Sequence, residues 1–221
     1  MKNWNTRLKH FLVGASLLCV QAIATADFDP RDQAHLQRWI AANKQESALA
    51  AFEEHLRQLD VHTVVPVYQL LRTATDWRKS ECVKVKAQPF EIPRKEKWAQ
   101  MVTTLKFVHM LREKGILPAF EVVSAYRNPA VDKCAKGNGF RHPTAGAFDL
   151  FVAPTEIRAA VKRLCDFHAS EGKNHGMGFS QYPSGRLHID TVRHDTWGYD
   201  THTGTSVCPK KLTKKSPAPQ R

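Results

Sequence analysis

Two short segments of the sequence carry side chains that could bind one metal ion together. His142 is followed seven residues later by Asp149, and His188 lies 39 residues beyond Asp149, in a stretch where polar and apolar residues alternate. Two imidazoles and one carboxylate form a ligand set that suits Zn²⁺ and leaves a fourth position open for water. Zinc lowers the pKa of bound water, so such a site can produce a nucleophile near neutral pH. Pairs of histidine and aspartate also arise by chance in a chain with 11 histidines, so the surrounding sequence has to be considered.

The surrounding motifs follow a recognisable order. Ser124-Ala125-Tyr126-Arg127 comes first, then His142 with Ala147-Phe148-Asp149, then Gly176-Met177-Gly178-Phe179, and finally His188-Ile189-Asp190. From about residue 89 to residue 198, this order resembles the D-alanyl-D-alanine metallopeptidases, whose motif is Ser-x-His-x-x-Gly-x-Ala-x-Asp followed by His-x-Asp. The resemblance implies a fold shared with lysostaphin-type enzymes and the hedgehog signalling domain. It also implies the activity of a zinc carboxypeptidase or a murein endopeptidase.

The resemblance also implies roles for individual residues. His142, Asp149 and His188 would be the three zinc ligands, and Arg127 would hold a substrate carboxylate or the developing oxyanion. A guanidinium suits this role because it can bind a carboxylate through two parallel hydrogen bonds. Tyr126 and Ser124, in the same segment, are further candidates for substrate binding. The alternatives are a surface salt bridge for Arg127 and core packing for Tyr126.

The match departs from the family motif at several positions. Phe140 replaces the serine, Ala145 replaces the glycine, and Gly146 comes one position late. None of these positions is a zinc ligand, so the departures concern the geometry of the loop rather than metal binding. Several branches of the family also place a glutamate base three residues before the last histidine, and Gly185 occupies that position here.

Asp190 is the nearest acidic residue that could replace this base. Residues i and i+2 of a strand project from the same face, so Asp190 is expected on the same side as His188. Asp190 could therefore be the catalytic proton acceptor, or it could orient a ligand imidazole from outside the metal site. The sequence does not separate these two roles. His175 and His194 flank the last strand and could enter the cleft, although we interpret both as structural.

Residues 1–26 are predicted to be a secretory signal peptide. Basic residues begin the segment, a short apolar stretch follows, and Ala24-Thr25-Ala26 is typical of a cleavage site. The apolar stretch is shorter than the roughly 20 residues of a membrane-spanning helix. We therefore expect a secreted or periplasmic protein without stable membrane insertion after cleavage.

Four cysteines remain after the signal peptide, which fits an oxidising compartment. They allow three pairings, and the sequence does not choose among them. We favour Cys82–Cys134 and Cys165–Cys208, because each bond would tie a flank to the core. A structural zinc site of cysteine and histidine is a weaker alternative, because no Cys-x-x-Cys motif occurs.

The composition narrows the class of partner. The formal net charge is +12, and the signal peptide accounts for only three of the 33 basic residues. A basic exported protein suits an anionic partner such as the cell wall, although a solvated, solubilising surface would explain the same charge. Nucleic acid fits poorly, because no nucleic-acid-binding motif is present and the signal directs the chain out of the cytoplasm. We expect a monomer.

Periodicity predicts an α+β fold with a small antiparallel sheet flanked by helices. Helical patterns cover residues 31–60, 95–114 and 155–168, and a short helix is expected at 128–134. Strands are expected at 120–124, 147–152, 176–180 and 186–191, the last two joined by a Pro-Ser-Gly turn. The predicted organisation is a helical N-terminal extension at 27–88, a zinc peptidase domain at 89–208 and a basic disordered tail at 209–221.

The leading hypothesis is an exported zinc metallopeptidase that hydrolyses D-amino-acid peptide bonds in peptidoglycan stem peptides or cross-links. One alternative is a non-catalytic wall-binding module stabilised by zinc. Another is a basic exported protein whose ligand set is fortuitous and which binds lipopolysaccharide or wall polymers through charge.

Overall fold

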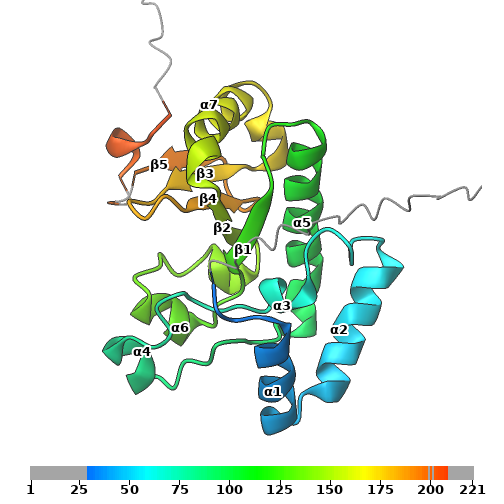
Figure 1. Cartoon of the computed structure of the whole chain (residues 1–221). Helices are drawn as coiled ribbons and strands as arrows, with labels where there is room; N and C mark the ends of the chain where they lie inside the picture. The colour runs from blue at the N-terminus through cyan, green and yellow to red at the C-terminus, as the bar shows by residue number, and fades with distance from the viewer. Residues whose placement is uncertain (1–28, 199, 201, 209–221) are drawn as a thin grey trace, which may run out of the picture.

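The computed structural model describes residues 29–198, 200 and 202–208 (Figure 1). Its centre is a five-stranded sheet with the strand order β1-β2-β4-β3-β5. The strands are β1 (Phe120–Ser124), β2 (Ala147–Val152), β3 (Gly178–Gln181), β4 (Leu187–Asp190) and β5 (Asp195–Trp197). The predicted signal peptide and the predicted tail lie outside the described residues.

The sheet is mixed, which corrects the prediction of a purely antiparallel one. Three neighbouring pairs are antiparallel, but β5 runs parallel to β3. After β4 ends at Asp190, beside the first residue of β3, residues 191–194 carry the chain past the start of β3 to its other edge. The chain then runs in the direction of β3, because β4 has brought it back to the end where β3 starts. Residues 195–197 are too few to show an alternating pattern, so the sequence did not predict this strand.

Seven α-helices surround the sheet in the described part of the chain. They are α1 (Gln33–Asn43), α2 (Glu46–Gln58), α3 (Val67–Leu70), α4 (Ser80–Lys84), α5 (Trp98–Glu113), α6 (Pro129–Cys134) and α7 (Pro154–Ser170). Lys44, in the left-handed conformation, separates α1 from α2, so the helical pattern at 31–60 forms two helices. In Figure 1, α5 and α7 lie beside the sheet, and α1 and α2 lie at the end nearer β1. Together, these features confirm an α+β fold.

One hydrophobic core connects the N-terminal helices to the sheet. Five fully buried members come from different elements: Leu36 of α1, Phe52 of α2, Leu105 of α5, Phe148 of β2 and Ile189 of β4. Burial of such side chains is the main favourable contribution to folding. The boundary proposed at residue 88 stays a prediction, and residues on both sides of it share this core.

Two buried arginines add polar links between the N-terminal segment and β1. Arg31 donates to the carbonyl of Val123 at 2.7 Å, and Arg72 donates to the carbonyl of Val122 at 3.0 Å. Both guanidinium groups also face acidic side chains, so their charges are compensated. Buried ions are stable only when they are paired in this way.

Both favoured disulfides are confirmed. Cys82 of α4 bonds to Cys134 of α6, and Cys165 of α7 bonds to Cys208. Two disulfides are typical of proteins in oxidising, extracytoplasmic compartments. Within the residues that the structure describes, no helix is long and apolar enough to cross a membrane.

Candidate metal centre

The register of the sheet places Asp149 beside His188. The two residues are direct partners across the antiparallel pair β2 and β4, so their side chains project from the same face. Both are almost fully buried, with 2 % of each residue exposed. The alternating pattern at 186–191 predicted this strand, and the pairing brings its histidine to the aspartate of β2.

His142 reaches the same point from the 3₁₀-helix η2 (His142–Thr144), which precedes β2. Its Nδ1 lies 2.6 Å from the carbonyl oxygen of Ala125. This contact fits an Nδ1–H donor and leaves Nε2 as the unprotonated nitrogen that could bind a metal. Ala145 then adopts the left-handed conformation, with φ of 63°, at the position where the family motif has glycine. The loop therefore keeps the turn that glycine would favour and accepts some strain in an alanine.

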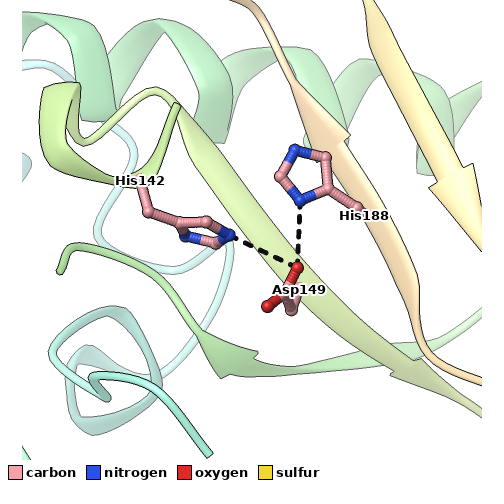
Figure 2. A group of neighbouring side chains, drawn as sticks. All are labelled: His142, Asp149 and His188. Carbon is pink, nitrogen blue, oxygen red and sulfur yellow. Dashed lines mark hydrogen bonds and ion pairs between the residues drawn. The ribbon is translucent and has the colours of Figure 1, made fainter. Parts of the chain in front are cut away.

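The three side chains converge on a small volume (Figure 2). Asp149 Oδ1 lies 3.0 Å from His188 Nδ1 and 3.4 Å from His142 Nε2. With one ligand atom taken from each residue, the three atoms lie within 4.8 Å of one another. Tetrahedral zinc with bonds of about 2.0–2.1 Å separates its ligand atoms by roughly 3.3 Å. The group could therefore hold a metal ion.

A polar atom without a hydrogen-bond partner supports this conclusion. His142 Nε2 is buried and makes no hydrogen bond within the described part of the chain. Burial of an unsatisfied polar atom carries an energetic cost, and such atoms are few in folded proteins. A metal ion at this point would satisfy the nitrogen, so the residues present fit a metal.

The protonation states of Asp149 and His142 are suited to a cation, whereas His188 would have to lose a proton first. Burial alone would raise the pKa of Asp149, but His142 and Arg127 outweigh it and hold this pKa well below its usual range. Burial and the nearby Arg127 lower the pKa of His142, which favours the neutral imidazole. Burial also acts to lower the pKa of His188, but hydrogen bonds with Asp149 and Asp190 raise it above the ordinary value.

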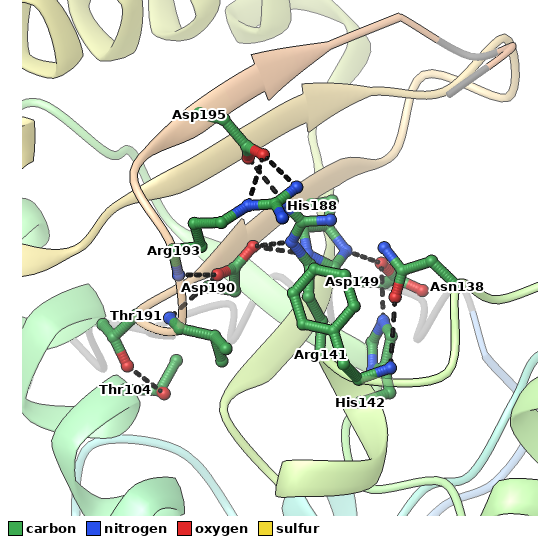
Figure 3. A network of polar contacts seen from close by, with 12 residues as sticks. Thr104, Asn138, Arg141, His142, Asp149, His188, Asp190, Thr191, Arg193 and Asp195 are labelled. Atoms are coloured by element: carbon green, nitrogen blue, oxygen red, sulfur yellow. Dashed lines mark hydrogen bonds and ion pairs between the residues drawn. The ribbon is translucent and has the colours of Figure 1, made fainter. Parts of the chain in front are cut away.

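Asp190 lies on the far side of the His188 ring from Asp149 (Figure 3). Its Oδ2 is 3.1 Å from His188 Nε2, and the residue is fully buried. Its Oδ1 accepts from the backbone N–H groups of Val192 and Arg193 at 2.9 and 3.2 Å. The strand spacing correctly predicted that Asp190 and His188 share a face. Asp190 contacts the outer nitrogen of the imidazole and does not line the cavity in front of the ligands.

Arg141 supports Asp190 from behind. Its Nε forms an ion pair with Asp190 Oδ2 at 2.7 Å, and its Nη2 bonds to Asp195. The guanidinium carbon lies 4.5 Å from the ring centre of Phe140 and 3.9 Å from that of Trp197. Phe140, which replaces the serine of the family motif, therefore packs on the arginine that precedes His142.

Arg127 faces the opposite edge of Asp149. Its Nη2 bonds to Asp149 Oδ2, and its Nε donates to Ser124 Oγ at 2.9 Å. Its Nη1 lies 3.7 Å from Asp132 Oδ1. Nε and Nη2 are thus committed to hydrogen bonds within the protein, and a ligand at Nη1 would share this nitrogen with Asp132. Ser124 positions Arg127, and a direct role of Ser124 in substrate binding stays a prediction.

A cavity of about 220 Å³ opens in front of the three candidate ligands, and Arg127 lines it. Ser124 and Tyr126 do not line this cavity, and both are buried. Tyr182 does line it, and its hydroxyl lies 3.3 Å from His188 Nδ1. Burial, followed by the nearby Asp149, raises the pKa of Tyr182, so its hydroxyl stays a neutral donor.

Several residues of the site carried no clear signal in the sequence. Arg141 stands at an unspecified position of the family motif, and Trp197 was interpreted as packing only. His175 packs against Phe107 and Phe167, away from the cavity, and His194 stacks on His168 with ring centres 4.1 Å apart. The structural interpretation of the two histidines therefore agrees with their surroundings.

Comparisons with known proteins identify no relative of this chain. No protein-family model, no curated protein and no solved structure matches it.

Proposed function

We propose that this protein is an exported zinc metallopeptidase that hydrolyses peptide bonds next to D-amino acids in peptidoglycan. The observation that carries the proposal is the convergence of His142 Nε2, Asp149 Oδ1 and His188 Nδ1 at the base of a cavity. Three protein ligands with one open position are typical of catalytic rather than structural zinc sites. When bound, zinc acts as a Lewis acid toward a carbonyl oxygen and lowers the pKa of water.

The residues around the ligands have separate roles in this proposal. Arg127 holds Asp149 through Nη2, and a carboxylate of the stem peptide would share Nη1 with Asp132. This arrangement supports a contact through one nitrogen rather than a two-bond clamp. Tyr182 is a neutral hydroxyl donor on the cavity wall, where it can bond to an oxygen that gains negative charge.

The position of Asp190 supports an orienting role. The carboxylate is fully buried and faces the outer nitrogen of His188, so it can fix the tautomer and the direction of the imidazole. Proton transfer to the leaving amine needs a group that reaches the cavity. Among the described residues that line the cavity, Asp76 and Asp149 are the carboxylates, so Asp76 is the first alternative to Asp190.

The experiment combines metal analysis with digestion of murein. The mature chain should contain about one equivalent of zinc, as expected for one three-ligand site. It should release muropeptides from purified sacculi, and a chelator should stop this release until zinc is returned. The His188→Ala variant should lose both zinc and hydrolysis. Unchanged digestion by metal-free protein would refute the proposal.

A non-catalytic wall-binding module is the second candidate. The burial of Asp190 outside the cavity favours it, because the expected proton acceptor does not reach a substrate there. Zinc at one equivalent, zinc-dependent binding to sacculi and no change in the muropeptide profile would support this module over the peptidase.

A further inference from the structure

A second cavity adjoins the metal cavity. It holds about 680 Å³ and lies between the start of α1 and the turn that joins β3 to β4. Thr75 and Arg186 line both cavities, so the two spaces meet at these residues. Arg186 bonds to Thr75 at this junction. The second cavity therefore lies next to the metal cavity, with Thr75 and Arg186 between them, and extends to the N-terminal helical segment.

The walls of the second cavity are strongly basic. Arg31, Arg38, Arg78 and Arg186 line it, and Asp29 is the acidic residue among the described ones that do so. Asp29 is paired with Arg31 at 2.6 Å. Arg38, Arg78 and Arg186 have no carboxylate within salt-bridge distance in the part of the chain that the structure describes. Three positive charges thus face this space without a compensating acid.

The neighbouring side chains add to this picture. Arg78 lies over the ring of Trp77, with its guanidinium carbon 4.7 Å from the ring centre, and Trp77 also lines the cavity. Burial lowers the pKa of His35, and the nearby Arg38 and Arg78 lower it further, as expected in a positive field. The Trp77 ring therefore holds Arg78 through a cation–π contact, and guanidinium groups positioned in this way suit carboxylates.

The sizes of the two cavities indicate how a substrate would extend. Pockets that bind small molecules usually measure roughly 300–1,000 Å³. The metal cavity, at about 220 Å³, lies below that range, whereas the second cavity, at about 680 Å³, lies within it. A substrate at the metal ligands therefore gains more contact by continuing past Arg186 than by ending in front of the ligands.

We propose that the second cavity binds the carboxylates of a peptide segment whose scissile bond lies at His142, Asp149 and His188. This inference deepens the proposed function and rests on it for the position of the scissile bond. It gives the N-terminal helical segment, through Arg38 of α1, a part in substrate binding. It also favours cleavage within an extended, acidic peptide, as in a cross-link, over removal of a terminal residue from a short one.

The test uses the whole mature protein and N-acetylated tetraglutamate as the probe, with tetraglutamine as the uncharged control. Binding is measured by titration calorimetry on zinc-free protein at low salt. Arg38→Gln combined with Arg78→Gln removes two exposed cations from the cavity wall. The matched control combines Arg112→Gln with Arg158→Gln, which removes the same charge from exposed positions on α5 and α7.

The wild type and the matched control should bind tetraglutamate equally, and the cavity variant should bind roughly 2- to 30-fold more weakly, as expected for the loss of two exposed ion pairs. Equal binding by the two double variants overturns the inference, whether or not the protein hydrolyses peptides. Tighter binding of inorganic tripolyphosphate than of tetraglutamate overturns the assignment to carboxylates.

A kinetic measurement separates this inference from the proposed function. In the zinc-loaded protein, the cavity variant should raise the KM for a cross-linked muropeptide and leave kcat/KM for a D-Ala-D-Ala dipeptide unchanged. If the cavity variant lowers kcat/KM equally for both substrates, the inference that the substrate extends into the second cavity is overturned. If the protein binds tetraglutamate in a charge-dependent way but hydrolyses neither the muropeptide nor the dipeptide, the peptidase is refuted. The second cavity is then supported as a carboxylate site.

Discussion

Replacing Asp190 with asparagine should weaken zinc binding, because Asp190 holds the imidazole of His188 from its outer nitrogen. In the structure, Asp190 Oδ2 lies 3.1 Å from His188 Nε2 and 2.7 Å from Arg141 Nε. An asparagine keeps the size of the side chain but removes its charge. Its amide oxygen could still accept from His188 Nε2, but as a neutral acceptor, and the ion pair with Arg141 would be lost.

The expected magnitude follows from these contacts. Loss of a carboxylate that orients a metal-bound histidine usually weakens metal affinity about 10- to 100-fold, or roughly 1.4–2.7 kcal/mol. The free energy of unfolding of the zinc-free protein should also fall by about 3 kcal/mol, because Arg141 would remain buried with one acidic partner fewer. If Asp190 were instead the proton acceptor, hydrolysis would fall by roughly 10²–10⁴-fold with zinc affinity intact.

Competition with a chromophoric chelator measures zinc affinity, and chemical denaturation measures stability. Asp195→Asn is the matched control. Asp195 bonds to Arg141, as Asp190 does, but it is Asp190 that contacts His188 Nε2. The control should lower stability and leave zinc affinity within about threefold of the wild type. Wild-type zinc affinity in Asp190→Asn would refute the orienting role, whatever happens to hydrolysis.

Three further predictions concern the same site. Arg127→Lys should raise the KM for stem peptides and weaken zinc roughly 10-fold, because the single nitrogen of lysine replaces the two guanidinium nitrogens that bond to Ser124 and Asp149 separately. Unchanged zinc affinity and kinetics would contradict this role. Gly178→Ala should also weaken zinc, because a Cβ there would lie 2.0 Å from Asp190 Oδ2, and a thermal unfolding curve should show whether the fold survives. Zinc affinity should fall about 10-fold per pH unit as the pH drops below the pKa of His188, which lies above 6.5 in the zinc-free protein. A constant zinc affinity in titrations between pH 5.5 and 8 would be inconsistent with His188 as a ligand.

The sequence predicted the candidate ligand set from residue types and the family resemblance, and the structure brings these three residues together. The alternation at 186–191 placed His188 and Asp190 on one face of a strand, and the structure bears this out. The substitution of Ala145 for the glycine of the family motif left the geometry of the loop open, and the structure shows Ala145 in the left-handed conformation. Such signals depend on backbone geometry that a few neighbouring residues determine.

The supporting residues were harder to predict, because their roles depend on contacts between distant segments. Arg141 reaches Asp190 and Asp195, 49 and 54 residues away, and its sequence neighbours give no sign of either contact. The direction of β5 likewise depends on how residues 191–194 cross the end of β3. The place of Tyr126 outside the cavity follows from the turn after β1, which periodicity does not describe.

The order of the disulfides has a consequence for biogenesis. The first remaining cysteine pairs with the second and the third with the fourth, closing spans of 52 and 43 residues that do not overlap. A chain that crosses a membrane from its N-terminus presents its cysteines in this same order. An oxidase that joins each cysteine to the next one to emerge would therefore make both native bonds directly. Because thiol–disulfide exchange is needed only to correct wrong pairs, maturation of this protein should not depend on a disulfide isomerase.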